Sequence, residues 1–152
     1  MIIDSHVHLN DEDLFPRVEE VITKAKEEGV KAFICVGYDR ESSEMALDIA
    51  TMYDEVYAAI GIHPGAAKRY KEEDLVWLEQ NLKHKKVVAI GEIGLDYYWE
   101  KAYEIKQKEL FIKQINLANT YRLPIVVHMR DATNDTYEII KQYRDKELSG
   151  VM

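Results

Sequence analysis

MIIDSHVHLN, residues 1–10, places two histidines at the end of a short apolar run. His6 and His8 are two positions apart, and Asp4 comes shortly before them. Side chains at positions i and i+2 of a strand point to the same face, so an extended segment holds the two imidazoles side by side. The stretch therefore predicts a strand whose end can bind one metal ion through both histidines. Asp4 then either orients a ligating histidine or caps a turn.

Similar apolar runs rich in β-branched residues recur along the chain, and each is typical of a buried strand in a parallel sheet. They are MIID (1–4), KAFICVGY (31–38), VYAAIGIHP (56–64), KVVAIGEIGLD (86–96), LPIVVHMRD (123–131) and SGVM (149–152). Charged segments with apolar residues at helical spacing lie between them. This alternation predicts parallel strands joined by right-handed crossovers, and therefore an α/β fold that is a doubly wound sheet or a barrel.

Composition limits the classes of protein to which the chain can belong. Its 152 residues are 47% hydrophobic, which suits one ordinary globular domain. No apolar stretch reaches the length of a membrane span, and Cys35 inside AFICVGY is typical of a buried thiol, so we expect a cytoplasmic location and no membrane contact. The net charge of -8 argues against broad electrostatic capture of nucleic acid. Bound divalent cations can still supply positive charge where a nucleic-acid substrate needs it.

Polar residues lie where the apolar runs end: His6, His8, His63, Glu92, His128 and Arg130. The carboxyl ends of parallel strands lie on one side of a sheet and converge in a barrel, so we expect these side chains to meet. A single histidine at a strand end is more often a hydrogen-bonded structural residue than a ligand. Several histidines with a carboxylate, however, supply nitrogen and oxygen donors that suit Zn²⁺, Mn²⁺ or a related ion. The joint pattern predicts a metal site.

Other catalytic patterns are missing from the sequence. It has no G-x-S-x-G nucleophile elbow and no G-x-x-x-x-G-K-[ST] phosphate loop, and its lone cysteine lies within a strand rather than in an exposed basic pocket. Metal-assisted hydrolysis remains. The aromatic residues 97–99, YYW, follow the fourth strand and are interpreted either as loop packing or as a base-stacking platform.

Five motifs resemble, in order and spacing, the TatD-related metal-dependent deoxyribonucleases, a branch of the amidohydrolase-like TIM barrels. They are SHVHLN (5–10), GIHP (61–64), AIGEIGLDYY (89–98), QKELFIKQINLA (107–118) and LPIVVHMRDA (123–132). The resemblance covers the whole chain, and GEIGLDYY followed by LPIVVHMRDA is a specific combination. It implies a (β/α) barrel with one or two divalent ions, Mg²⁺, Mn²⁺ or Zn²⁺, that hydrolyses phosphodiester bonds in DNA, with exonuclease-type trimming.

The same resemblance implies roles for individual residues. The metal ligands that it implies are His6, His8, Glu92 and His128. Glu92 matches the carboxylate that bridges two ions, and His63 and Arg130 match positions that line the site. We expect His63 and Arg130 to contact the scissile phosphate, since the planar guanidinium of an arginine matches phosphate oxygens. Glu92 and His63 are thus the expected catalytic residues.

The chain holds fewer βα units than a full barrel. A complete (β/α) barrel has eight units in about 250 residues, whereas this chain has five and the start of a sixth strand at SGVM. We therefore expect residues 1–152 to form a single partial TIM-barrel domain that is truncated at the C-terminus. In the family, a further ligand histidine and a metal-binding aspartate follow in later strands. Unpaired edges and an exposed inner face predict self-association, with a flavodoxin-like rearrangement or a loose oligomer favoured over a closed barrel.

Alternatives to an active deoxyribonuclease stay open at this point. The chain is either part of such an enzyme or a catalytically inactive chain that binds metal or self-associates. Related amidohydrolases cut C–N bonds and share the H-x-H motif on the first strand. Because a fold alone does not determine a substrate, an amidohydrolase-type activity is a further alternative.

Overall fold

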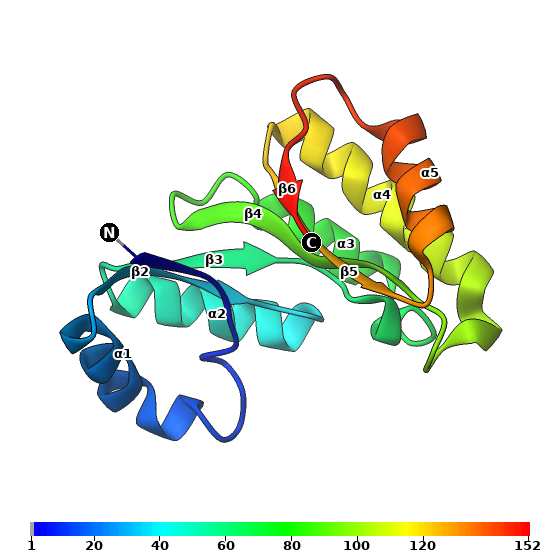
Figure 1. Cartoon of the computed structure of the whole chain (residues 1–152). Coiled ribbons are helices and arrows are strands. Elements are labelled where there is room, and N and C mark those ends of the chain that lie inside the picture. The colour runs from blue at the N-terminus through cyan, green and yellow to red at the C-terminus, as the bar shows by residue number, and fades with distance from the viewer. Residues whose placement is uncertain (1) are drawn as a thin grey trace.

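The computed structural model describes residues 2–152, which form one sheet of six parallel strands with helices between them (Figure 1). The strands are β1 (Ile2–Val7), β2 (Val30–Val36), β3 (Val56–Ile60), β4 (Val87–Asp96), β5 (Ile125–Arg130) and β6 (Gly150–Val151). The helices are α1 (Val18–Glu27), α2 (Arg40–Met52), α3 (Glu72–Asn81), α4 (Glu104–Tyr121) and α5 (Thr133–Tyr143). Short 3₁₀ helices are η1 (Phe15–Arg17), η2 (Pro64–Ala66) and η3 (Lys101–Tyr103). Within residues 2–152 no helix has the length and apolar character needed to cross a membrane.

The strand order is β1-β2-β3-β4-β5-β6, so every strand lies beside its neighbour in the sequence. A flavodoxin-like sheet would place β1 inside the sheet, and the expectation of such a rearrangement is therefore wrong. Figure 1 shows a curled sheet with the helices on its outer side. Because each helix packs on that side, the chain advances around the sheet in one direction. The prediction of an incomplete TIM-type barrel with five βα units and a sixth strand is confirmed.

The main core lies between the sheet and the helices. Large side chains fill it, such as Phe33 and Ile90 from the strands and Leu78 and Phe111 from the helices. Cys35 is completely buried there, as predicted. The helices therefore pack against the outer face of the sheet through apolar residues at helical spacing.

A second, smaller apolar cluster lies on the inner face of the sheet. It consists of Val36, Ala59, Ala89 and Val126, one residue from each of β2 to β5. These residues alternate with residues of the main core along their strands, so they point to the opposite face. They are at most 4% exposed, and the expectation of an exposed inner face is wrong for the centre of the sheet. Small side chains on a curled face are shielded by the neighbouring strands.

β1 and β6 are the edge strands, as predicted. Their side chains are not buried, and Ile2, Ile3 and Val151 are about half exposed, because each edge strand has a neighbour on one side only. The interpretation of MIID and SGVM as buried strands is therefore wrong for residues 2–4 and 149–152, and Met1 lies outside the described residues. Self-association through these edges stays a prediction.

Two irregularities in strand pairing coincide with predicted site residues. Along Asp4–Val7, β1 advances one residue more than β2, and along Ile90–Ile93, β4 advances one residue more than β5. Such β-bulges bend the strand and re-aim a side chain. His6 lies in the first bulge and Glu92 in the second. Strict alternation along a strand is therefore not sufficient to say where these two side chains point.

Gly94 of β4 has φ +140°, and a Cβ added to it would lie 2.0 Å from the backbone oxygen of His128. We expect Gly94→Ala to lower the free energy of unfolding by about 3 kcal/mol or more, because backbone strain and a clash act together. Gly29, which lies two residues after α1 and has φ +98° with open space around it, is the control. Gly29→Ala introduces strain without a clash and should cost about 1 kcal/mol. Equal losses in urea unfolding would contradict this account.

Candidate metal centre

Five predicted site residues lie together at the carboxyl ends of the strands. His6 belongs to β1 and His8 follows it, Glu92 belongs to β4, His128 to β5, and His63 lies between β3 and η2. They form two groups that share Glu92, one with His6 and His8 and the other with His63 and His128. In each group the possible ligand atoms lie within 4.8 Å of one another. The sheet therefore brings together residues that are more than 100 positions apart in the sequence.

Glu92 lies between the two histidine groups. Its Oε2 is 3.6 Å from Nε2 of His6, and its Oε1 is 3.2 Å from Nδ1 of His128. Burial disfavours a charged carboxylate at this position, but the hydrogen bond with His128 and the charges of the surrounding histidines outweigh burial and lower the pKa of Glu92. An ionised carboxylate with one oxygen toward each group is suited to bridge two ions.

Hydrogen bonds give His8 and His63 opposite protonation patterns. Nδ1 of His8 is 2.8 Å from the backbone oxygen of Val36, which only accepts, so Nδ1 carries the proton and Nε2 keeps its lone pair. Nε2 of His6 lies 3.3 Å from that nitrogen. The backbone N–H of Gly65 donates to Nδ1 of His63 over 2.9 Å, so the proton of the neutral ring is on Nε2. His8 thus fits a metal ligand, whereas His63 fits a hydrogen-bond donor.

His63 is neutral at ordinary pH. Burial, followed by repulsion from His128, lowers the pKa of His63 to about 4. The two rings contact edge to face, with centroids 4.2 Å apart. His63 can therefore donate a hydrogen bond to an oxygen of a bound anion without carrying charge itself.

His128 is held between two carboxylates. Its Nδ1 faces Glu92, and its Nε2 is 2.9 Å from Oδ2 of Asp96. Burial alone would lower the pKa of His128, but the hydrogen bonds to Glu92 and Asp96 raise it. Asp96 is buried, and its Oδ1 accepts the backbone N–H groups of Tyr98 and Trp99 at 3.0 and 2.9 Å. A fixed carboxylate on one ring nitrogen is the usual partner of a histidine that ligates metal through the other nitrogen.

The chemistry of this donor set fits a divalent ion. Imidazole nitrogens and a carboxylate suit Zn²⁺ and Mn²⁺, and the carboxylate with waters suits Mg²⁺. The residues that would hold such ions are His6, His8, Glu92 and His128. When bound, a divalent ion polarises a phosphoryl or carbonyl oxygen of a substrate and lowers the pKa of a bound water.

A hollow of about 330 Å³ opens beside the cluster. Its lining includes His8, Tyr38, His63, Arg69 and Glu92. Nη2 of Arg69 is 3.0 Å from Oδ2 of Asp39, the N-cap residue of α2, so this ion pair orients a guanidinium in the lining of the hollow. The hollow thus combines candidate metal ligands with a fixed cation, which suits an anionic substrate.

Arg130 does not line this hollow. Its guanidinium carbon is 4.2 Å from the ring centroid of Tyr98 and 5.5 Å from that of Trp99. The expected contact of Arg130 with a scissile phosphate stays a prediction. The guanidinium of Arg130 instead lies against the rings of Tyr98 and Trp99.

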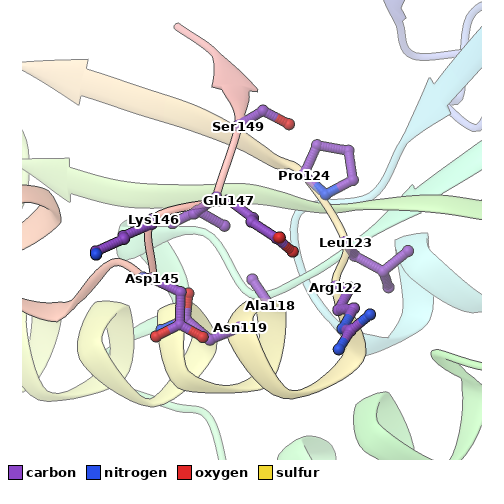
Figure 2. A pocket seen from close by; sticks show the side chains of 10 residues that line it. Ala118, Asn119, Arg122, Leu123, Pro124, Asp145, Lys146, Glu147 and Ser149 are labelled. Carbon is purple, nitrogen blue, oxygen red and sulfur yellow. The ribbon is translucent and has the colours of Figure 1, made fainter.

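A larger hollow, of about 460 Å³, lies at the opposite end of the strands (Figure 2). Asn119 near the end of α4, Pro124 before β5, and Glu147 and Ser149 before β6 line part of it. None of the predicted ligands lines it. Because active sites of parallel barrels form at the carboxyl ends of the strands, its size does not make it the better candidate.

Two buried glutamines of α4 hold the segments that carry site residues. The side chain of Gln114 accepts from the backbone N–H of Ile62 over 2.8 Å and donates to the carbonyl of the same residue over 2.9 Å. Gln107 makes the same pair of bonds to Asp96, also at 2.8 and 2.9 Å. Seven residues make about two helical turns, so both glutamines lie on one face of α4. This face aligns the segment before His63 with the end of β4.

Three residues of the site, Asp96, Tyr38 and Arg69, are not among the candidate functional residues that the sequence patterns predict. Asp96 carried a usable signal, because a carboxylate that closes an apolar run is buried only when it is paired. Tyr38 and Arg69 carried none, since they follow different strands and meet the cluster only through the paths of two loops.

A curled parallel sheet with histidines and a carboxylate at the carboxyl ends of its strands defines a class, the (β/α)-barrel proteins with a metal centre. A protein-family model described as "TatD related DNase" matches residues 3–152. The chain belongs to this family, and the resemblance found in the sequence is confirmed.

Curated relatives cover the whole of this chain. It is 46% identical over 152 residues to the "uncharacterized metal-dependent hydrolase YabD" of Bacillus subtilis. The matched region covers 100% of this chain and 60% of YabD. It is 32% identical over 152 residues to the similarly described YjjV of Escherichia coli, covering 99% of this chain and 58% of YjjV. The chain thus spans about three fifths of the length of these relatives.

Solved structures share the fold. The crystal structure of YjjV matches with a TM-score of 0.88 at 31% identity, over 93% of this chain and 56% of that one. A TatD-family hydrolase from Entamoeba histolytica matches with a TM-score of 0.80 at 26% identity, over 93% of this chain and 54% of that one. The half-barrel described above therefore corresponds to part of a larger fold in these structures.

Removing the side chain of Gln107 should weaken the end of β4. Gln107→Ala leaves the buried N–H and carbonyl of Asp96 without these partners, and we expect the free energy of unfolding to fall by about 2 kcal/mol. Gln142 is exposed on α5, and Gln142→Ala serves as the matched control. Similar midpoints for the two variants in urea unfolding would show that the hydrogen bonds of Gln107 add nothing.

Asp96→Asn should weaken metal binding without unfolding the chain. The amide oxygen of asparagine can still accept from Tyr98 and Trp99, but its NH₂ group then faces Nε2 of His128 and moves the ring proton to Nδ1. We expect metal affinity, measured by calorimetry with Mn²⁺ or Zn²⁺, to fall by about 10- to 100-fold. Glu109→Gln, on the exposed side of α4, should bind as the wild type does. Unchanged affinity in Asp96→Asn would exclude the orienting role.

Proposed function

We propose that this chain carries the metal centre of a divalent-metal-dependent phosphodiesterase that acts on DNA. The observation that carries the proposal is the position of Glu92, with one oxygen toward each of two histidine groups. A shared carboxylate suits the pair of ions, about 4 Å apart, that many phosphoryl-transfer sites use. Membership of a family described as DNases supports the choice of substrate.

The residues of the chain would act in distinct ways on a bound phosphodiester. His6, His8, Glu92 and His128 would bind the ions. The neutral His63 would donate a hydrogen bond from Nε2 to a phosphate oxygen, and Asp96 would keep Nε2 of His128 protonated. Arg69 would add positive charge to the lining of the hollow, in a chain whose net charge of -8 otherwise repels DNA.

The test compares hydrolysis of a single-stranded DNA oligonucleotide and of bis(p-nitrophenyl) phosphate by the wild-type chain and by Glu92→Gln, each with Mg²⁺, Mn²⁺ or Zn²⁺. We expect metal-dependent release of product by the wild type. Loss of the shared ligand should slow it by about 100-fold or more, because ions contribute several kcal/mol to stabilising the transition state. Glu109→Gln is the control and should keep full activity.

The outcome separates the alternatives. Metal binding without turnover by the wild-type chain would favour the reading as an inactive metal-binding chain. Turnover of an anilide or a cyclic amide, with no hydrolysis of either phosphodiester, would favour the amidohydrolase-type activity. Hydrolysis that survives Glu92→Gln would contradict the role of Glu92.

A further inference from the structure

Two large aromatic side chains stand exposed beside the metal centre. Tyr98 and Trp99 lie two and three residues after the end of β4, and 55% of Tyr98 and 68% of Trp99 is exposed. Their rings meet edge to face, with centroids 4.5 Å apart. Packing of a loop would bury aromatic surface, whereas more than half of each residue here faces solvent. Exposed aromatic side chains that adjoin one another form a candidate binding surface.

Arg130 adds a cation to this pair. Its guanidinium lies over the face of Tyr98 at 4.2 Å and within 5.5 Å of the centroid of Trp99, both within the range of a cation–π contact. Arg130 lies two residues after His128 on β5, and its Cα is paired with that of Asp96 on β4. The guanidinium is therefore fixed against the aromatic pair at the same strand ends as the candidate metal ligands.

Asp96 connects the aromatic pair to the metal centre. One of its carboxylate oxygens accepts the backbone N–H groups of Tyr98 and Trp99, and the other lies 2.9 Å from Nε2 of His128. The backbone beneath the two rings is thus held at a set position relative to a candidate ligand. A preformed surface binds with little loss of conformational freedom, which favours binding.

The chemistry of this surface matches an unpaired nucleobase. Flat aromatic faces stack on bases of any identity, and a guanidinium beside them can contact the phosphate of the same nucleotide. A paired base within a duplex has both faces covered by its neighbours and cannot reach an aromatic side chain. The surface therefore suits a single strand or a frayed end.

We propose that Tyr98, Trp99 and Arg130 form a stacking subsite that binds an unpaired nucleobase next to the phosphate held at the metal centre. The proposal rests on the proposed function, since it assumes a nucleic-acid substrate. It goes further by naming the part of the chain that contacts a base. It also assigns Arg130 to this subsite and leaves Arg69 as the cation of the hollow.

The test measures binding of two fluorescent octamers by anisotropy, one of thymidine nucleotides and one with abasic sugars, in Ca²⁺ so that turnover does not interfere. We expect the wild-type chain to prefer the octamer with bases by about tenfold or more, from a stacking energy of 1–3 kcal/mol per base. Trp99→Ala and Tyr98→Ala should reduce this preference by about tenfold and leave the affinity for the abasic octamer unchanged. Oligouridylate in a parallel titration shows whether RNA is bound as DNA is.

Three controls keep the outcome clear. Tyr137 is equally exposed on α5, and Tyr137→Ala should keep the wild-type preference. Trp99→Phe retains an aromatic face and should restore most of the binding. The affinity for Mn²⁺ should be the same in all of these variants, because none of the substituted residues is a candidate ligand.

Equal affinity for the two octamers in the wild-type chain would overturn the inference, as would an unchanged preference in both Trp99→Ala and Tyr98→Ala. These results differ from a failure of the proposed function. A chain that hydrolyses bis(p-nitrophenyl) phosphate but does not distinguish the octamers has the activity and lacks the subsite. A chain that prefers bases yet hydrolyses neither substrate has the subsite and lacks the activity.

Discussion

The site depends on the hydrogen bonds made by the buried carboxylate of Asp96. A carboxylate taken out of water is tolerated only when hydrogen bonds replace its hydration. The carboxylate of Asp96 accepts these hydrogen bonds from Nε2 of His128 and from the backbone N–H groups of Tyr98 and Trp99. The side chain of Gln107 bonds the backbone of Asp96. Satisfying this one group therefore fixes the end of β4, the ring of a candidate ligand on β5 and the aromatic pair.

The histidines of the site differ in role because their hydrogen-bond partners differ. A carbonyl on Nδ1 leaves His8 with a free nitrogen, an N–H on Nδ1 makes His63 a donor, and two carboxylates hold His128 between them. Burial opposes ionisation of Glu92, but the hydrogen bond with His128 and the neighbouring histidines lower its pKa, so an ionised carboxylate lies among nitrogen donors. Such a concentration of donors is stabilised by a cation, which is why metal chemistry is the interpretation that accounts for all of these residues together.

Some features of the fold were visible in local patterns and others were not. The alternation of apolar runs and charged helical segments predicted the strands and helices, and the GEIGLDYY and LPIVVHMRDA motifs identified the family. The expected flavodoxin-like rearrangement was wrong because it treated an unclosed barrel as unstable. On the inner face, small residues such as Ala59 and Ala89 lie shielded between strands, and this shielding depends on the curl of the sheet rather than on composition.

The sequence by itself determined the class of fold, the family and the residues that can ligate a metal, because periodicity and residue type are local properties of the chain. Only the tertiary structure decided which ring nitrogen carries the proton in His8 and in His63, that Glu92 lies between two groups, and that Arg130 stacks on Tyr98 rather than lining the hollow. Each of these depends on contacts between segments far apart in sequence. The position of Glu92 depends also on the β-bulge of β4, which shifts its side chain away from the direction that simple alternation predicts.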